Sequence, residues 1–110
     1  MPKYLFLFSY SSDSVKAMVK SPSDRSAAAK ALVESLGGTQ EAFYWMHGQH
    51  DGFLIADLPD GVAASALSVA VGAAGAIVDA ETHEIFGHDD QTAIVTKADD
   101  ALKAYKAPAG

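Results

Sequence analysis

The sequence predicts an α+β fold in which four antiparallel strands are covered by helices on one face of the sheet. The main observation is the order of the segments: runs rich in aromatic and aliphatic residues alternate with runs of helical spacing as β-α-β-β-α-β, and a further helix follows. The length of 110 residues suits one domain with one core. The apolar fraction of 49% favours a packed core over disorder.

The first half of the chain contains a strand, two helices and a second strand. Residues 3–10, KYLFLFSY, have strand composition. Residues 12–20 have the spacing of a short amphipathic helix, for which Ser12 or Asp13 is the expected cap. A second helix is expected with Ser21 as its N-cap and Pro22 as its first residue, and Gly37-Gly38 ends it. Residues 39–47, TQEAFYWMH, are expected to form the next strand.

The second half begins with a hairpin. HGQHDG, residues 47–52, is expected to connect the strand before it to a strand over residues 51–58. Pro59 stops that strand, and Asp60 caps a helix of small apolar residues over residues 61–75. In the last strand, residues 76–86, the expected helix-facing side carries Ala76, Val78 and Ala80, and the opposite side carries Ile77, Asp79, Glu81, His83 and Ile85. Residues 89–106 are expected to form the C-terminal helix.

This order is the ferredoxin-like βαββαβ arrangement with an extra C-terminal helix, and it leaves one face of the sheet without helices. We expect a domain over residues 1–88, followed by the helix and tail of residues 89–110. The open face is expected to carry Tyr4, Phe6, Phe8, Tyr10, Phe43, Trp45, Phe53 and Ile55. A surface this apolar favours association. The chain is therefore predicted to form a homodimer, or a higher homo-oligomer, in which two sheets enclose a lumen as a dimeric α+β barrel.

Four short motifs resemble the GYD domain family, whose members are small bacterial proteins grouped with the dimeric α+β barrels. They are LGG (residues 36–38), Tyr44, GQHD (residues 48–51) and LPD (residues 58–60), and the resemblance covers roughly residues 2–88. The family's Gly-x-Tyr-Asp turn has His50 in place of the tyrosine here. The resemblance implies the fold and dimerisation. It implies no particular reaction, because similar barrels include cofactor-free monooxygenases, isomerases and haem-binding enzymes.

Charge and composition exclude several classes of function. The net charge is −6, and residues 39–90 hold nine acidic residues and all four histidines but no lysine or arginine. Nucleic acid is therefore not an expected partner, because phosphate binding requires a basic surface. The absence of cysteine excludes disulfides and thiolate chemistry. No apolar run is long enough for a membrane span and no signal peptide is recognisable, so we expect a cytoplasmic protein with no membrane partner.

The candidate site residues are histidines and aromatic residues. His83, which follows Glu81 and Asp79 on one strand face, and His47 are the candidate catalytic bases. The expected ligand-binding residues are Tyr4, Phe6, Phe8, Trp45, His47, His50, Phe53 and His83. The spacing His47-x-x-His50 also resembles a metal pair, but turn chemistry explains it and zinc would need further ligands. We therefore expect no metal site and no cofactor.

The sequence is compatible with three functions. The first is a barrel that binds a small apolar or aromatic molecule in its lumen. The second is an enzyme, either a cofactor-independent oxygenase or isomerase with His83 or His47 as base, or a haem binder with one of them as axial ligand. The third is a purely structural assembly module.

Overall fold

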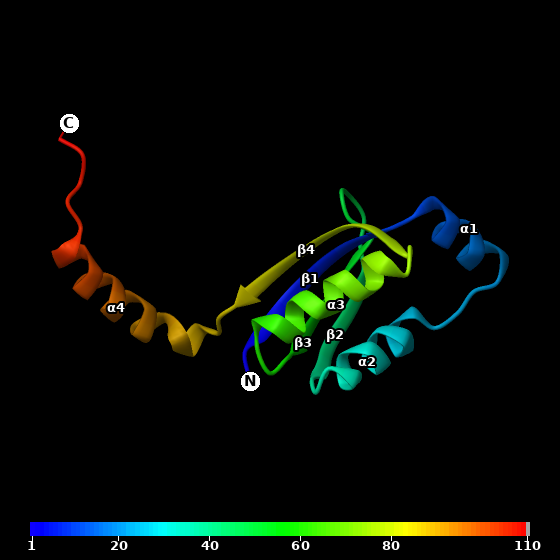
Figure 1. Cartoon of the computed structure of the whole chain (residues 1–110), viewed down its shortest axis with the longest axis horizontal. Helices are drawn as coiled ribbons and strands as arrows, with labels where there is room; N and C mark the ends of the chain where they lie inside the picture. The colour runs from blue at the N-terminus through cyan, green and yellow to red at the C-terminus, as the bar shows by residue number, and fades with distance from the viewer. Residues whose placement is uncertain (110) are drawn as a thin grey trace.

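The computed structural model describes residues 1–109 as a four-stranded sheet with helices on one side and a C-terminal helix that projects from the body (Figure 1). The strands are β1 (Lys3–Tyr10), β2 (Thr39–Trp45), β3 (Gly52–Asp57) and β4 (Ile77–Ile85). They lie in the order β2-β3-β1-β4, and every neighbouring pair is antiparallel. The helices are α1 (Ser12–Lys20), α2 (Arg25–Ser35), α3 (Gly61–Ala73) and α4 (Gln91–Ala104), with a 3-10 turn η1 (His88–Asp90) before α4. The predicted ferredoxin-like α+β fold is confirmed.

Hydrogen bonds to side chains fix where the first helices begin. The hydroxyl of Ser11 caps α1 by accepting from the amide of Ser14 at 3.1 Å, one residue earlier than predicted. The prediction that Ser21 caps α2 is wrong. Because α1 continues to Lys20, Ser21 is its C-cap, and the carboxylate of Asp24 caps α2 by accepting from the amide of Ala27 at 3.0 Å.

Two other helix ends follow the sequence signals. Asp60 caps α3 as predicted, and its carboxylate accepts from the amide of Ala63 at 2.9 Å. After α2 the chain turns at Gly37, whose φ of 82° is the left-handed conformation that glycine adopts without steric cost. No helix within residues 1–109 has both the length and the apolar character needed to cross a membrane.

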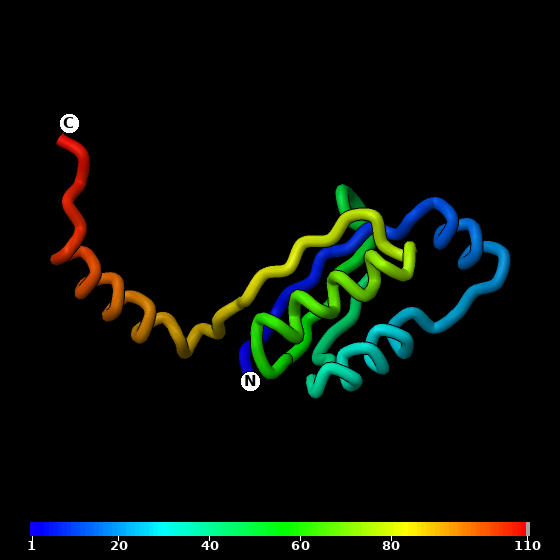
Figure 2. Tube along the Cα trace, in the orientation of Figure 1, coloured from blue at the N-terminus to red at the C-terminus, as the bar shows by residue number. Residues whose placement is uncertain are grey.

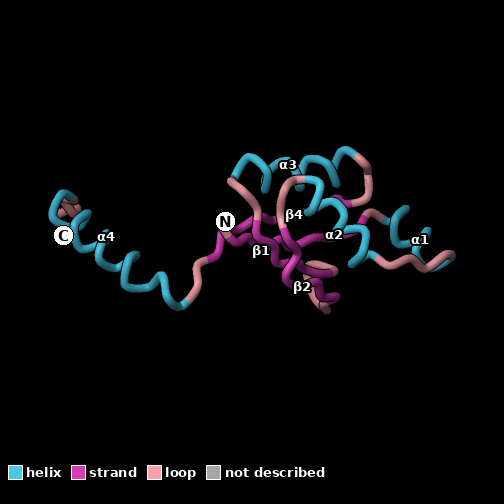
Figure 3. Tube along the Cα trace, turned by 90° about the horizontal axis from the view of Figure 1, so that it is seen from below, coloured by secondary structure: helices cyan, strands magenta, loops and turns pink. Residues whose placement is uncertain are grey.

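The core lies between the sheet and helices α2 and α3, which are on the same side of the sheet (Figure 3). Its buried apolar members are Tyr4, Phe6, Phe8, Val33, Leu54, Ala56, Leu58, Ala64 and Leu67. The predicted aromatic open face is therefore largely wrong. Tyr4, Phe6 and Phe8 point toward the helices, and Tyr10 and Phe43 pack against the same core. The physical reason is the Ala-rich composition of α2 and α3, because small helical side chains need large side chains on the sheet to fill the space beneath them.

The strand β4 has an irregularity that makes the prediction for Ile77 and Val78 wrong, because the two residues exchange faces. Ser9 pairs with Asp79 and Tyr10 with Ile77, so the register shifts at Val78. As a result Ile77 lies near Tyr10 on the helix side, and Val78 is exposed. Beyond the shift, the predicted alternation holds: Ala80 pairs with Phe8 of the core, and Thr82 shares a hydrogen bond with Ser68 of α3.

The C-terminal helix extends away from the body. The trace in Figure 2 leaves the sheet at the end of β4, and the C-terminus lies at the far tip of this arm. The arm contributes to overall dimensions of 58 × 34 × 23 Å. None of the residues of α4 is buried, and its apolar side chains Ile94, Val95 and Leu102 are all exposed.

Candidate functional site on the open face of the sheet

The open face has an apolar centre, which we define as Leu5, Leu7, Tyr44, Phe53 and Ile55. The strand register brings these residues together. Leu5 is paired with Ile55, Leu7 with Phe53, and Phe53 with Tyr44, whose ring stacks on that of Phe53 at a centroid distance of 5.3 Å. Leu5, Leu7, Phe53 and Ile55 are partly buried and Tyr44 is exposed. The single chain thus leaves a continuous apolar surface on this face.

One end of the apolar centre is bordered by an ion-pair network. The ammonium group of Lys3 contacts the carboxylates of Glu41 and Asp57, the latter at 3.1 Å. The two carboxylates raise the pKa of Lys3, mainly through hydrogen bonds to Glu41 and then to Asp57. Because the network is partly exposed to solvent, it adds little to stability. Its position gives the open face a polar boundary at this end.

The β4 side of the apolar centre carries what we call the histidine cluster: His50, Glu81 and His83, with Ser9 and Asp79 at its edge. Glu81 is paired with Leu7 and His83 with Leu5, so the cluster runs alongside the apolar centre. His50 Nε2 lies 2.7 Å from a carboxylate oxygen of Glu81, and His83 Nε2 lies 3.5 Å from the other oxygen. On the far side of the imidazole ring, His50 Nδ1 lies 3.3 Å from the hydroxyl of Ser9 and 3.8 Å from Asp79. One carboxylate is thus shared by two imidazoles.

The hairpin between β2 and β3 holds His50 in this position. The amide of Asp51 donates to the carbonyl of Phe8 at 2.8 Å, and the carboxylate of Asp51 accepts from the amide of Tyr10 at 2.8 Å. The amide of Met46 closes the turn by donating to the carbonyl of Asp51. These bonds fasten the hairpin to the end of β1, and His50 is only 6% exposed.

The hydrogen bonds of His50 can be satisfied in either protonation state. As an imidazolium, the ring donates from Nε2 to Glu81 and from Nδ1 to Ser9, and the Ser9 hydroxyl donates to the carbonyl of Gln49 at 3.4 Å. As the neutral Nε2–H tautomer, the ring still donates to Glu81 and accepts from Ser9. The hydrogen bond from His50 lowers the pKa of Glu81, and His83 adds to this effect, so Glu81 is a carboxylate at neutral pH.

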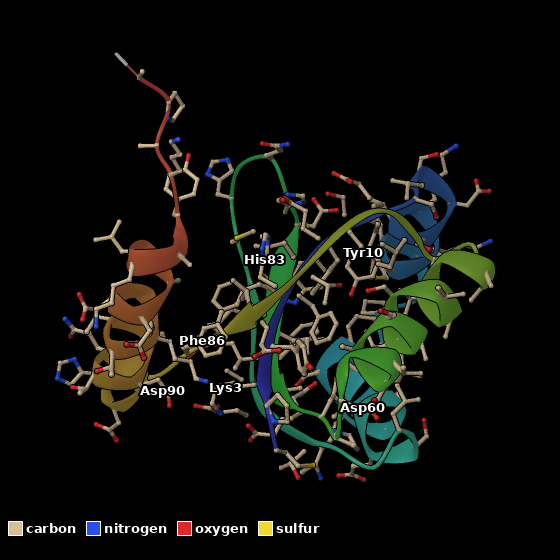
Figure 4. All side chains as sticks on the ribbon, turned by 60° about the vertical axis from the view of Figure 1, so that its left-hand side comes forward. Lys3, Tyr10, Asp60, His83, Phe86 and Asp90 are labelled. Carbon is tan, nitrogen blue, oxygen red and sulfur yellow. The ribbon has the colours of Figure 1, made fainter. Side chains whose placement is uncertain are left out.

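The predicted site residues are divided between the two faces of the sheet. The structure brings His50, His83 and Phe53 together on the open face, whereas Tyr4, Phe6 and Phe8 lie in the core on the other side. Figure 4 shows this separation, with Tyr10 on the side of the sheet that carries α3 and His83 on the other. Trp45 lies near Tyr10 at a ring distance of 5.5 Å, and His47 is exposed in the hairpin.

Several residues of the open face were not predicted as site residues. Leu5, Leu7 and Tyr44 are absent from the predicted open face, and the sequence does not indicate that Ser9 and Glu81 are partners of His50. The period of two in β1 was visible in the sequence, but both faces of KYLFLFSY are apolar, so the alternation alone could not decide which face the helices cover. The bonds from His50 to Ser9 and Glu81 join positions 41 and 31 residues apart, and no local signal predicts them.

The histidine cluster does not have the arrangement of a metal centre. Within residues 1–109, no group of three or more histidine, aspartate or glutamate side chains is placed to hold a metal ion. In particular, His47 and His50 do not act as a pair, because His50 turns into the sheet while His47 stays exposed. The cluster can instead exchange protons and donate hydrogen bonds at the edge of an apolar surface.

The fold and this face define a small ferredoxin-like α+β protein with a histidine-bearing polar cluster beside an uncovered apolar sheet. The sequence pattern of the GYD domain family matches residues 4–95, and the chain belongs to that family. The match confirms the resemblance and extends past residue 88 into the first turn of α4. A search of curated proteins found no match to the chain.

Proposed function

We propose that two copies of the chain pair through their open faces and that the chamber between them binds a small apolar or aromatic molecule. The observation that carries this proposal is the apolar centre itself, which is continuous over β1, β2 and β3 and is bordered by polar groups at the Lys3 end and along β4. A bound molecule would contact Leu7, Phe53 and Ile55, while the exposed His83 would meet any polar substituent it carries.

The apolar centre has five side chains, whereas the predicted open face had eight. We therefore expect a weaker dimer than the predicted face would give. If each of the five side chains of the apolar centre loses about 40 Å² more surface, burial at about 25 cal/mol per Å² favours pairing by ~10 kcal/mol for both protomers together. Association itself costs several kcal/mol or more. We therefore expect a dimer that dissociates measurably on dilution.

Light scattering coupled to size exclusion, over a range of protein concentrations, tests the dimer. Ile55→Glu places a charge in the apolar centre and should give a folded monomer by circular dichroism. The matched control is Val69→Glu, because Val69 is an exposed valine of α3 on the helix side and its replacement should leave the dimer intact. A wild-type chain that stays monomeric at high concentration would contradict the proposal.

Binding in the chamber can be tested with 1-naphthol as a neutral aromatic probe. Nuclear magnetic resonance should show shifts at Leu7, Phe53 and Ile55 in the wild type, and these shifts should be lost in Ile55→Glu. Shifts that appear at exposed hairpin residues alone, or no shifts at all, would count against a chamber. In that case a structural assembly role without ligand would explain the same dimer.

A second candidate function is acid–base catalysis by the histidine cluster. It is favoured by the contact of 3.5 Å between His83 Nε2 and Glu81, because a carboxylate that orients an imidazole is a recurrent feature of catalytic bases. The shorter contact of 2.7 Å from His50 holds that carboxylate in place. His83 is half exposed beside the same carboxylate, so it is the group that can reach a substrate on the open face. It would take a proton from an acidic C–H or O–H group, as an isomerase or a cofactor-independent oxygenase requires.

Hydrogen–deuterium exchange of enolisable ketones and phenylacetone-type substrates in D2O tests this candidate without knowledge of the full reaction. His83→Gln should abolish the exchange, and the control His88→Gln should not, because His88 lies in η1 outside the cluster. Absence of exchange with the wild-type protein across the panel would contradict base catalysis. For the haem alternative, His83 borders the apolar centre whereas His47 does not, so a Soret band that survives His83→Gln would contradict His83 as axial ligand.

A further inference from the structure

A cavity lies on the other side of the sheet, between α2 and α3. Helix α2 packs chiefly on β2 and α3 on β4, and the two helices make no extensive contact with each other in the part of the chain that the structure describes. The middle of β1 is therefore not fully covered by either helix. The resulting cavity has a volume of about 120 Å³.

The walls of this cavity are almost entirely apolar. Helix α2 contributes Ala28, Ala29 and Leu32, and helix α3 contributes Leu67 and Val71. The floor includes Phe6 and Phe8, two residues that the sequence predicted to bind a ligand on the opposite face. An engineered apolar cavity of roughly 150 Å³ stays dry and binds benzene. By that comparison, this cavity suits an apolar group of about the size of one aromatic ring.

One cationic group, Arg25 at the start of α2, lies at the edge of this apolar cavity and also lines a neighbouring pocket formed with α1. The partly buried Lys3 is paired with two carboxylates, whereas the partly buried Arg25 forms no ion pair within residues 1–109. The guanidinium of Arg25 donates a hydrogen bond to the hydroxyl of Ser23 at 3.0 Å. Arg25 and Tyr10 both line the cavity, and the positive charge of Arg25 opposes the rise in the pKa of Tyr10 that burial causes.

Asp24 precedes Arg25 in the chain and Asp51 lines the neighbouring pocket, and each carboxylate is held by a backbone amide. Asp24 accepts from the amide of Ala27, and Asp51 accepts from the amide of Tyr10. A guanidinium presents five donors in a planar fork that matches a carboxylate. Arg25 thus places N–H donors that can bind a carboxylate beside a cavity whose walls are almost entirely apolar.

We propose that this cavity binds a small carboxylic acid with an apolar tail of about one ring, with the tail between α2 and α3 and the carboxylate on Arg25 and the Tyr10 phenol. The site is separate from the open face, so it does not depend on dimerisation or on the histidine cluster. Its specificity comes from two requirements, one on the tail, set by the cavity volume, and one on the head group, set by the guanidinium.

The test uses 3-phenylpropionate as the probe and 3-phenylpropan-1-ol as its uncharged counterpart, followed by nuclear magnetic resonance on the full chain. Both should shift the resonances of Ala29, Leu67 and Val71, and the acid should bind about tenfold more tightly than the alcohol, as expected for a hydrogen bond to a charged group. Shifts confined to Phe53 and Ile55 would place binding on the open face and would overturn this proposal while supporting the chamber.

Three variants separate the two requirements. Arg25→Gln should reduce the affinity for the acid to that of the alcohol and leave the alcohol unchanged, which also shows that the variant is folded. Lys30→Gln is the matched control, because Lys30 is an exposed cation on the same helix and pairs with Glu34, and it should change neither affinity. Ala28→Leu, at an exposed position that lines the cavity, should weaken both probes at least tenfold.

Two further results would also overturn the proposal. One is equal affinity for the acid and the alcohol in the wild type, because the guanidinium would then contribute nothing. The other is unchanged binding of both probes in Ala28→Leu, because the tail would then lie outside the cavity.

Discussion

Gly38, in the LGG motif, is the position where a single methyl group should cost most. A Cβ built on Gly38 would lie 2.3 Å from the carbonyl oxygen of Asp57, 2.6 Å from a methyl carbon of Leu58 and 3.1 Å from one of Val33. Leu58 and Val33 are fully buried, and the Asp57 carbonyl belongs to the backbone of β3, so none of the three can move aside freely. Overpacking a core typically costs 1–3 kcal/mol. With three such contacts, Gly38→Ala should lose about 3 kcal/mol.

Urea and thermal unfolding followed by circular dichroism measure this loss. For a chain of this size, about 3 kcal/mol corresponds to a fall in Tm on the order of 12 °C. Gly72→Ala is the matched control, since nothing lies within 4 Å of its added Cβ and the position is inside α3. Alanine is the better helix former, so the control should gain about 0.5–1 kcal/mol. The reasoning is refuted if Gly38→Ala unfolds within 2–3 °C of the wild type while Gly72→Ala behaves as expected.

Three further outcomes follow from the contacts. The hydrogen bond from His50 lowers the pKa of Glu81 in the folded chain. The stability that this bond contributes is therefore complete above the pKa of Glu81 in the unfolded chain and is lost as the pH falls through its lower pKa in the folded chain. In His50→Gln, ¹³C titration should show the Glu81 pKa rising toward its ordinary value, and an unchanged pKa would contradict the assignment. Removing the α3 cap with Asp60→Ala should cost about 1 kcal/mol in urea unfolding, and a loss below about 0.3 kcal/mol would mean that the cap bond at 2.9 Å contributes little. A chain that ends at His88 should keep the wild-type Tm within about 2 °C, because α4 is exposed throughout and contacts chiefly η1; a larger fall would show that the arm stabilises the domain.

The sequence alone was sufficient for the elements and their order. Period-two and helical spacings, the Gly37 turn and the Asp60 cap are local signals, and each was found where it was predicted. The motifs from LGG to LPD gave the family, which the match over residues 4–95 confirms. The errors among local signals were small: Asp24, not Ser21, caps α2 because α1 runs to Lys20 and leaves Ser21 as its C-cap.

The faces of the sheet were decided by tertiary packing. Both sides of β1 are apolar, so the sequence could not tell whether Tyr4, Phe6 and Phe8 or Leu5 and Leu7 meet the helices. The answer depends on the volume that the Ala-rich helices leave to be filled, which is a property of the packed molecule. The same packing moved Ile77 to the helix side through the register shift at Val78.

The sequence also predicted only some of the residues of each candidate site. His50 and His83 were recognised as candidates from their residue type and their acidic neighbours, because those are local facts. Their connection through Glu81, and the placing of Arg25 beside a cavity floored by Phe8, need contacts between positions far apart in the chain. Local propensity and periodicity fix which segments form, whereas side-chain volumes across the core and hydrogen bonds between distant strands fix which groups meet, and only the folded chain contains those.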